Sequence, residues 1–134
     1  MANIQKINNE ISNVVEFLHN KNEIKPFLED IFLIRLQVAG MDFIDNIDEI
    51  FPNLNNGTKL ELFREKDNEF DKLAILVKYN GNKIGYVPRK HNVVLAHLLD
   101  GGKELYGVVC EAFQDEIYEG YPFKVVEFEI YLKE

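Results

Sequence analysis

The chain has few of the side chains on which nucleophilic and metal-dependent enzymes rely. It contains 134 residues, with no tryptophan, one cysteine (Cys110) and one serine (Ser12). A single cysteine leaves no partner for a disulfide or a cysteine-based metal site, and neither Ser12 nor Cys110 stands out as part of a nucleophile, base and acid constellation. His19, His91 and His97 lack the spacing of zinc ligands. We therefore expect a protein without catalytic activity, metal or other cofactor.

Long apolar runs are absent as well. No stretch approaches the roughly 20 apolar residues that a membrane-spanning helix requires. The first residues, MANIQKINNEIS, lack the charged start and apolar core of a secretion signal. These absences predict a cytoplasmic protein that does not interact with membranes.

Acidic residues outnumber basic ones, but the two signs are segregated along the chain. The formal net charge is −8. Residues 1–71 hold 7 basic and 14 acidic residues, residues 72–103 hold 6 and 1, and residues 104–134 hold 2 and 8. No carboxylate lies between Lys72 and Leu99. This basic block is either a solvated face that balances acidic neighbours or a surface for an anionic partner.

The hydrophobic pattern predicts one leading helix and then mostly strands. Apolar residues recur at helical spacing in residues 3–20, and the apolar stripe of that helix is expected to pack on the rest of the protein or on a second copy. After Pro26, short apolar runs punctuated by glycine and proline predict strands. These strands are expected at 31–39, 59–64, 72–79, 83–87, 105–113 and 124–132, with a short helix at 93–99 and a further helical turn within 45–51.

Short, punctuated strands favour a small barrel. A chain of this length builds one core, and Asn80-Gly81-Asn82 is typical of a tight hairpin turn. Strands and helices do not alternate, which excludes a doubly wound parallel sheet. We therefore predict a mainly β (α+β) protein: an OB-like or SH3-like barrel of five to six bent strands with one short internal helix, preceded by the amphipathic N-terminal helix.

Four segments together resemble the HIRAN domain, a small module found in fork-remodelling helicase-like ATPases and as a stand-alone bacterial protein. The most specific pair is Asn-x-aromatic-Asp-x-x-Ala-Ile at 68–75 and Ile-Gly-Tyr-Val-Pro-Arg at 84–89. The resemblance begins near Ile31, which divides the chain into a helical extension (1–30) and a HIRAN-like domain (31–134). The segments are VAG (38–40), LELFREKDNEFDKLAILV (60–77), GNKIGYVPRKHNVVLAHLLDGG (81–102) and GVVCEA (107–112).

The resemblance implies a barrel that binds single-stranded DNA and, in the helicase-linked members, recognises the free 3′-hydroxyl end. It also implies a role in DNA repair, with a separate ATPase or nuclease as a partner. An ATPase would have to be a separate domain, because these residues contain no phosphate-binding loop. By this resemblance, the residues of this chain that correspond to the family's nucleic-acid-binding site are Phe43, Phe70, Asp71, Tyr86, Arg89, Lys90 and, late in the chain, Tyr121 or Tyr118.

Each of these residues has an expected role. Phe43 and Phe70 would stack on bases, and Asp71 would accept a hydrogen bond from the terminal 3′-hydroxyl. Tyr86 would face a nucleotide, while Arg89 and Lys90 would hold its phosphates. One departure from the family is Asp42, which stands where the helicase-linked members have a basic residue before the first stacking aromatic.

Less specific interpretations stay open at this point. The aromatic residues fit a hydrophobic core equally well, and Asp71 fits a turn that it caps through backbone amides. At the level of function, the acidic balance favours an alternative in which the chain is a protein-interaction adaptor that keeps the barrel without binding DNA.

Overall fold

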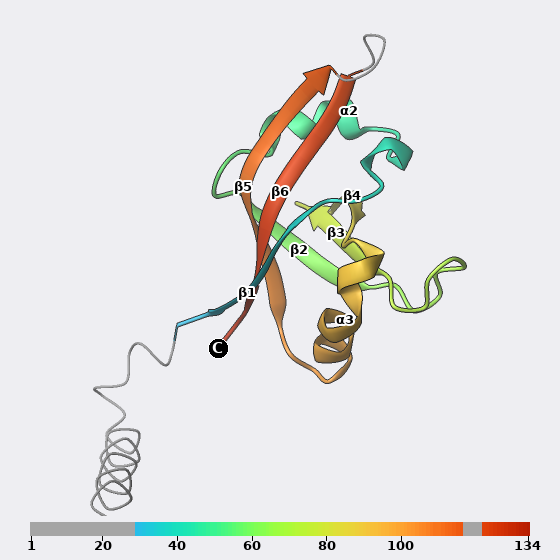
Figure 1. Ribbon diagram of the computed structural model, residues 1–134, viewed down its shortest axis with the longest axis vertical. Coiled ribbons are helices and arrows are strands. Elements are labelled where there is room, and N and C mark those ends of the chain that lie inside the picture. Colours follow the sequence, from blue (N-terminus) through green and yellow to red (C-terminus); the bar gives the residue numbers. More distant parts are fainter. Residues whose placement is uncertain (1–28, 117–121) are drawn as a thin grey trace, which may run out of the picture. The chain divides into compact units, whose positions relative to one another are not determined.

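In the computed structural model, which describes residues 29–116 and 122–134, Ile31–Lys133 form one compact unit. This unit is a mainly β, OB-like fold with one antiparallel sheet and two short α-helices (Figure 1), so the predicted fold class is confirmed. The elements are β1 (Ile31–Gln37), η3 (Met41–Phe43), α2 (Ile47–Ile50), η4 (Phe51–Asn53), β2 (Lys59–Arg64), β3 (Ile75–Tyr79), β4 (Asn82–Tyr86), η5 (Arg89–His91), α3 (Asn92–Asp100), β5 (Leu105–Glu116) and β6 (Pro122–Leu132).

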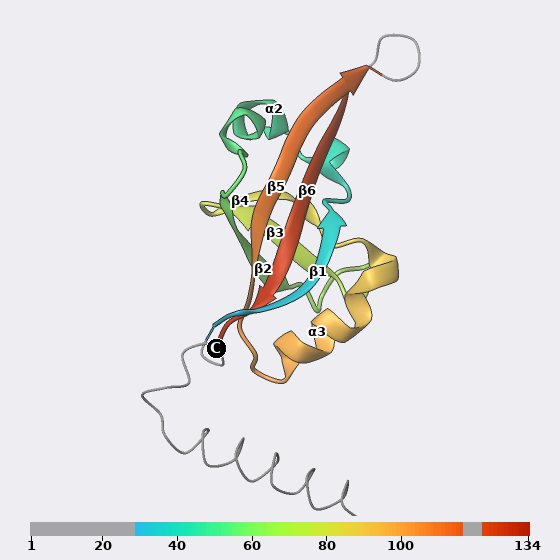
Figure 2. The same cartoon turned by 60° about the vertical axis from the view of Figure 1, so that its left-hand side comes forward.

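The six strands run in the order β1-β6-β5-β2-β3-β4, with β5 and β6 as the long hairpin seen in Figure 2. The two ends of this order meet just after β1. The backbone N–H of Val38 donates to Val126 on β6 at 2.9 Å, while Ala39 and Tyr86 exchange two backbone hydrogen bonds of 2.8 Å each. Residues 38 and 39 therefore bond to β6 on one side and to the end of β4 on the other, and this closes the bent sheet into a barrel.

Alternation along the strands builds the core. Leu60 and Leu62 on β2 are buried between the exposed residues Lys59, Glu61 and Phe63, which is the period-two pattern expected of a strand with one buried face. Phe128 and Ile130 on β6 are fully buried from the other side of the barrel. Buried apolar side chains of this kind supply most of the stabilisation of the fold.

The third strand begins later than the sequence predicts, at Ile75 instead of Lys72. The guanidinium of Arg64 donates to the carbonyl oxygens of Lys72 (3.0 Å) and Ala74 (2.8 Å). The N–H of Leu73 donates to the Asp71 carboxylate at 2.9 Å. The carbonyl oxygen of Ala74 also accepts from the backbone N–H of Glu65 at 3.0 Å, whereas the N–H of Ala74 donates to the carbonyl oxygen of Asp71 at 3.2 Å. Because these turn and side-chain bonds engage the backbone of residues 72–74, the segment forms a loop and not a strand.

Other expectations are close to the observed elements. The strand at 59–64 and the Asn80-Gly81 turn match β2 and the β3–β4 connection, and α3 starts one residue before the predicted helix. The expected helix at 3–20, Tyr118 and Tyr121 lie outside the described residues. Cys110 is half-buried, and its thiol donates to the Glu129 carboxylate at 3.1 Å. Within the two described ranges, no helix is long and apolar enough to span a membrane.

Candidate functional site

An open cleft lies where η3, the loop at 65–74 and the end of β4 meet. It consists of two adjoining hollows of about 910 and 280 Å³, which share Phe43, Asn68, Phe70 and Tyr86 in their linings. The Ala39–Tyr86 bridge that closes the barrel also brings these segments together, since η3 follows Ala39 directly. The cleft is thus a product of barrel closure.

Phe43 and Phe70 stand at the rim of the cleft with their rings in solvent. Their exposed fractions are 88% and 85%. The alternative in which both are core residues is therefore wrong. Two large aromatic side chains exposed beside one hollow are unusual on a protein surface and offer free ring faces to a ligand.

Tyr86 forms the floor between the two hollows. It is half-buried, and its hydroxyl donates to Glu65 Oε1 at 2.9 Å. Burial, together with this bond to a carboxylate, raises the pKa of the Tyr86 phenol above its usual 10.0. The hydroxyl is therefore protonated at neutral pH and engaged within the protein, so the ring is the part of Tyr86 that faces a ligand.

Asn68 holds the loop that carries Phe70. Its side-chain N–H donates to the same Glu65 Oε1 at 2.8 Å, and its Oδ1 accepts from the backbone N–H groups of Phe70 (2.8 Å) and Asp71 (2.9 Å). Glu65 and Asn68 were missed as site residues by sequence reasoning. Asn68 stands in the Asn-x-aromatic-Asp motif and was available as a signal, whereas nothing in the sequence distinguishes Glu65 from the neighbouring acids.

Asp71 is half-buried and already bonded through both carboxylate oxygens. Oδ1 accepts from the N–H of Leu73 at 2.9 Å, and Oδ2 accepts from the side-chain amide of Asn92 at 2.7 Å. The backbone bond from Leu73, the Asn92 amide and the nearby charges of Arg89 and Arg64 lower the pKa of Asp71 below its usual 3.8. Asp71 is therefore an ionised turn residue that ties the loop to α3, and each oxygen retains one further acceptor site.

We expect Asp71→Ala to reduce the free energy of unfolding by about 1–3 kcal/mol at neutral pH, because it leaves the amide of Asn92, which is 1% exposed, without its acceptor. The lowered pKa of Asp71 means that its contribution is complete at neutral pH and is lost as the pH falls below about 3.8. Urea unfolding at pH 7 and pH 3 measures this difference. An equal loss at both pH values would contradict a role for the ionised carboxylate.

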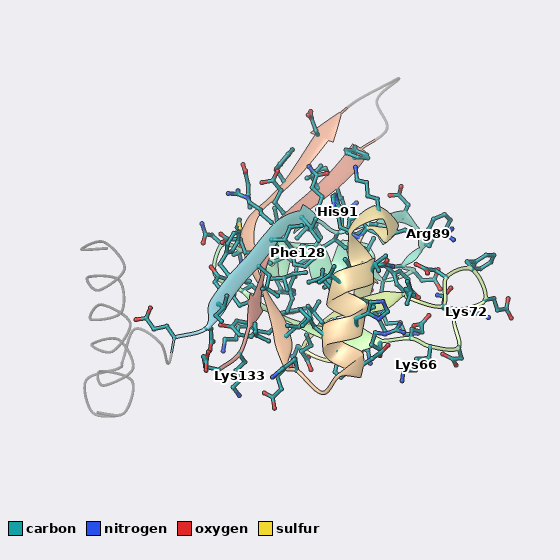
Figure 3. All side chains as sticks on the ribbon, turned by 60° about the horizontal axis from the view of Figure 1, so that its bottom comes forward. Lys66, Lys72, Arg89, His91, Phe128 and Lys133 are labelled. Carbon is teal, nitrogen blue, oxygen red and sulfur yellow. The ribbon has the colours of Figure 1, made fainter. Side chains whose placement is uncertain are left out.

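The predicted cations separate into different surroundings. Arg89 is exposed and lines the smaller hollow, and Lys83, which was not predicted as a site residue, lines the larger one. Lys90 does not line either hollow; it faces a different groove together with His91. Figure 3 shows Arg89 and His91 on different sides of the start of α3. Lys90 was predicted to lie beside Arg89 in one site, but the structure places it outside this cleft.

Carboxylates line the larger hollow, which the charge pattern did not reveal. Glu65, Asp67 and Glu69 belong to its lining, and the exposed Asp42 precedes Phe43 on η3. The fold therefore places the acidic loop beside Lys83 in the larger hollow, while Arg89 lines the smaller one. A polyanion is attracted at the Arg89 side and repelled at the Asp67 side of the same cleft. In the described ranges, no group of three or more metal-ligating side chains is placed to hold a metal ion.

The comparisons agree with this domain boundary and fold. The family model of the HIRAN domain matches residues 31–133. The chain belongs to the HIRAN family. No curated protein matches the chain.

Two solved structures resemble this HIRAN domain. A protein from Lactobacillus plantarum is 27% identical, with a TM-score of 0.59 over 76% of this chain and 96% of its own. The crystal structure of the HIRAN domain of human HLTF is 23% identical, with a TM-score of 0.53 over 78% and 81% of the two chains. The human domain has also been solved in its DNA-bound conformation, with a TM-score of 0.49 to this chain at 23% identity. The similarity to the human crystal structure establishes the shared fold.

Proposed function

We propose that this HIRAN domain is a non-catalytic module that binds single-stranded DNA in the cleft between η3 and the 65–74 loop. The observation that carries the proposal is the pair of almost fully exposed rings, Phe43 and Phe70, on either side of one cleft with Arg89 at its end. Sequence-tolerant single-strand binding needs this combination of aromatic faces for bases and a cation for phosphate. The family to which the chain belongs supports the same function.

The charge distribution determines where the phosphates of a bound strand lie. Bases stack between the two phenylalanine rings, and the phosphates lie toward Arg89 because Asp67 and Glu69 repel them on the other side. A strand that continued past the acidic loop would carry further phosphates into this repulsion. The acidic side therefore favours a strand that ends in the cleft.

We propose that the same cleft recognises a free 3′-hydroxyl end. Asp71 lines the smaller hollow beside Arg89, and its ionised carboxylate accepts from a hydroxyl but repels a terminal phosphate. The hydrogen bonds from Leu73 and Asn92 fix the carboxylate in place and leave acceptor capacity for one more donor.

End recognition is tested with short oligonucleotides that carry either a 3′-hydroxyl or a 3′-phosphate. Asp71→Ala should weaken binding of the hydroxyl end by roughly 1.5–3 kcal/mol and leave the phosphate end unchanged or improved. Asp67→Ala is the matched control, since it removes a carboxylate from the same cleft and should alter both ends alike. Both variants are compared below their melting temperatures. Equal losses for both ends in Asp71→Ala would show that Asp71 acts only on the loop.

Salt dependence distinguishes phosphate contact from other modes of binding. With Arg89 and Lys83 as the cations of the cleft, log Kd should rise with log salt concentration by about 0.7 per phosphate that is contacted, a total slope of about 1–2. Arg89→Gln should lower this slope by about 0.7. A slope near zero in the wild-type protein would contradict phosphate contact.

The second candidate function is a protein-interaction adaptor, favoured by one observation: Glu65, Asp67 and Glu69 line the larger hollow. An acidic aromatic cleft suits a basic segment of a partner protein better than a long polyanion. This alternative predicts no oligonucleotide binding even at low salt, so the titrations above separate the two functions.

A further inference from the structure

A second groove, of about 370 Å³, lies between β1 and α3 and is separate from the cleft described above. Its lining is mostly apolar: Leu33 and Ile34 on one side, Val93, Val94 and Leu98 on the other. Val93 and Val94 are 47% and 68% exposed. Figures 2 and 3 both show α3 on the side of the sheet where β1 lies, and the groove is lined by residues of these two elements. Neighbouring valines that are exposed on one helix face beside half-buried residues form a surface that is incompletely covered.

The groove runs along an unpaired strand edge. β1 is the first strand in the sheet order and pairs with β6 alone, and the barrel closes only beyond its end, at Ala39–Tyr86. Among the described residues, none forms a backbone hydrogen bond with the other edge of residues 31–37. A register shift between Phe32 and Ile34 marks a bulge at Leu33, which lets the consecutive Leu33 and Ile34 both face the groove. An exposed edge of this kind accepts a further strand.

A cation lies at the end of the groove where α3 begins. Lys90 belongs to the lining beside His91, and no ion pair in the described part of the chain includes either of them. A ligand with a negative charge at one end of an apolar segment matches this pattern.

We propose that this groove binds an extended peptide segment of a partner protein, with alternating apolar residues and Asp or Glu at one end, which adds as a strand to β1. Backbone hydrogen bonds to β1 supply the binding, alternate apolar side chains fill the groove against Val94, and the carboxylates lie at Lys90 and His91. No phenylalanine or tyrosine lines the groove, whereas two exposed phenylalanines line the cleft, so a peptide fits here better than a nucleic acid. This site does not depend on the function proposed for the cleft.

Peptide display with the full chain as bait tests the proposal. A random heptapeptide library is selected on the wild-type protein and counter-selected on Val94→Asp, which places a charge in the groove at an exposed position. His97→Asp is the matched control, because His97 is exposed on the same helix outside the groove lining. The expected peptides alternate apolar residues, end in Asp or Glu, and bind Val94→Asp at least tenfold more weakly while binding His97→Asp as well as the wild type.

Hydrogen exchange on the same complexes supplies the second readout. The selected peptide should slow exchange of amides within residues 31–37, and a version with N-methyl groups at alternate backbone amides should bind at least tenfold more weakly. Selection of basic peptides, of peptides that bind Val94→Asp equally well, or of none would overturn the proposal. A dimer in sedimentation equilibrium that Val94→Asp dissociates would also overturn it, since the groove would then hold a second copy. Protection of the groove from hydrogen exchange by an oligonucleotide would overturn it as well.

Discussion

Gly85→Ala is expected to destabilise the domain by about 3 kcal/mol or more, because it separates the two edges that close the barrel. A Cβ atom on Gly85 would overlap the carbonyl oxygen of Ala39 and lie 2.6 Å from Cγ1 of Val38. These are the residues that bridge β6 and β4. Backbone cannot give way as the end of a flexible side chain can, so the closing bridge at Tyr86 has to open.

Gly57→Ala separates steric overlap from backbone strain. Gly57 has a φ of +91°, but nothing lies within 4 Å of a Cβ atom placed there. Its replacement should cost only about 1–2 kcal/mol, the penalty for a left-handed conformation. Urea unfolding of both variants measures the difference. If Gly85→Ala were no more destabilising than Gly57→Ala, the close approach of Gly85 to Ala39 would not be required for barrel closure.

Replacing Phe43 and Phe70 together with alanine is expected to reduce the affinity for single-stranded DNA by about 2–6 kcal/mol while leaving the fold intact. Base–aromatic stacking is worth about 1–3 kcal/mol for each base, and both rings are free in solvent. Since neither ring packs in the core, the free energy of unfolding should change by less than about 0.5 kcal/mol for each substitution. Fluorescence anisotropy and thermal unfolding measure the two effects.

Phe63→Ala is the matched control for the double variant. Phe63 is 45% exposed on β2, outside the cleft, with Lys78 Nζ 4.9 Å from its ring centroid. It therefore also presents an exposed phenylalanine beside a cation. If Phe63→Ala weakened DNA binding as much as the double variant did, exposed aromatic rings in general, and not this cleft, would account for the affinity.

The parts of the fold that local sequence controls were predictable. β2 follows from the alternation of Leu60 and Leu62 with the charged Lys59 and Glu61, and α3 follows from helical spacing that ends before two glycines. The late start of β3 was not predictable from periodicity, because the apolar Leu73 continues the strand pattern. The start of β3 is set by bonds that periodicity does not report: the Arg64 guanidinium donates to two carbonyl oxygens of residues 72–74, and the N–H groups of Leu73 and Ala74 donate to Asp71.

The candidate site was predictable only in part, because its internal bonds join residues far apart in the chain. The resemblance named Phe43, Phe70, Asp71, Tyr86 and Arg89, which the structure brings to one cleft. It could not show that Asp71 is bonded to Asn92 or that Tyr86 is bonded to Glu65, since each pair is 21 residues apart.

Charge counting along the sequence was misleading for the same reason. Lys90 follows Arg89 directly, yet the turn of η5 points it toward the β1–α3 groove. The acidic loop at 65–71 belongs to the acidic first block of the chain, but it folds over the cleft next to Lys83. The electrostatic field of a site is set by neighbours in space, which blocks of sequence do not report.

Photo-crosslinking tests the central claim most directly. An oligonucleotide with 5-iodo-deoxyuridine at its 3′-hydroxyl end is irradiated with the full chain at low salt, and the adduct is located by mass spectrometry; the same base at the 5′ end is the control. The account predicts adducts at Phe43, Phe70 or Tyr86 with the 3′-terminal probe and far fewer with the 5′-terminal one. Adducts confined to other surfaces, or none with the folded protein at low salt, would contradict single-strand binding in this cleft.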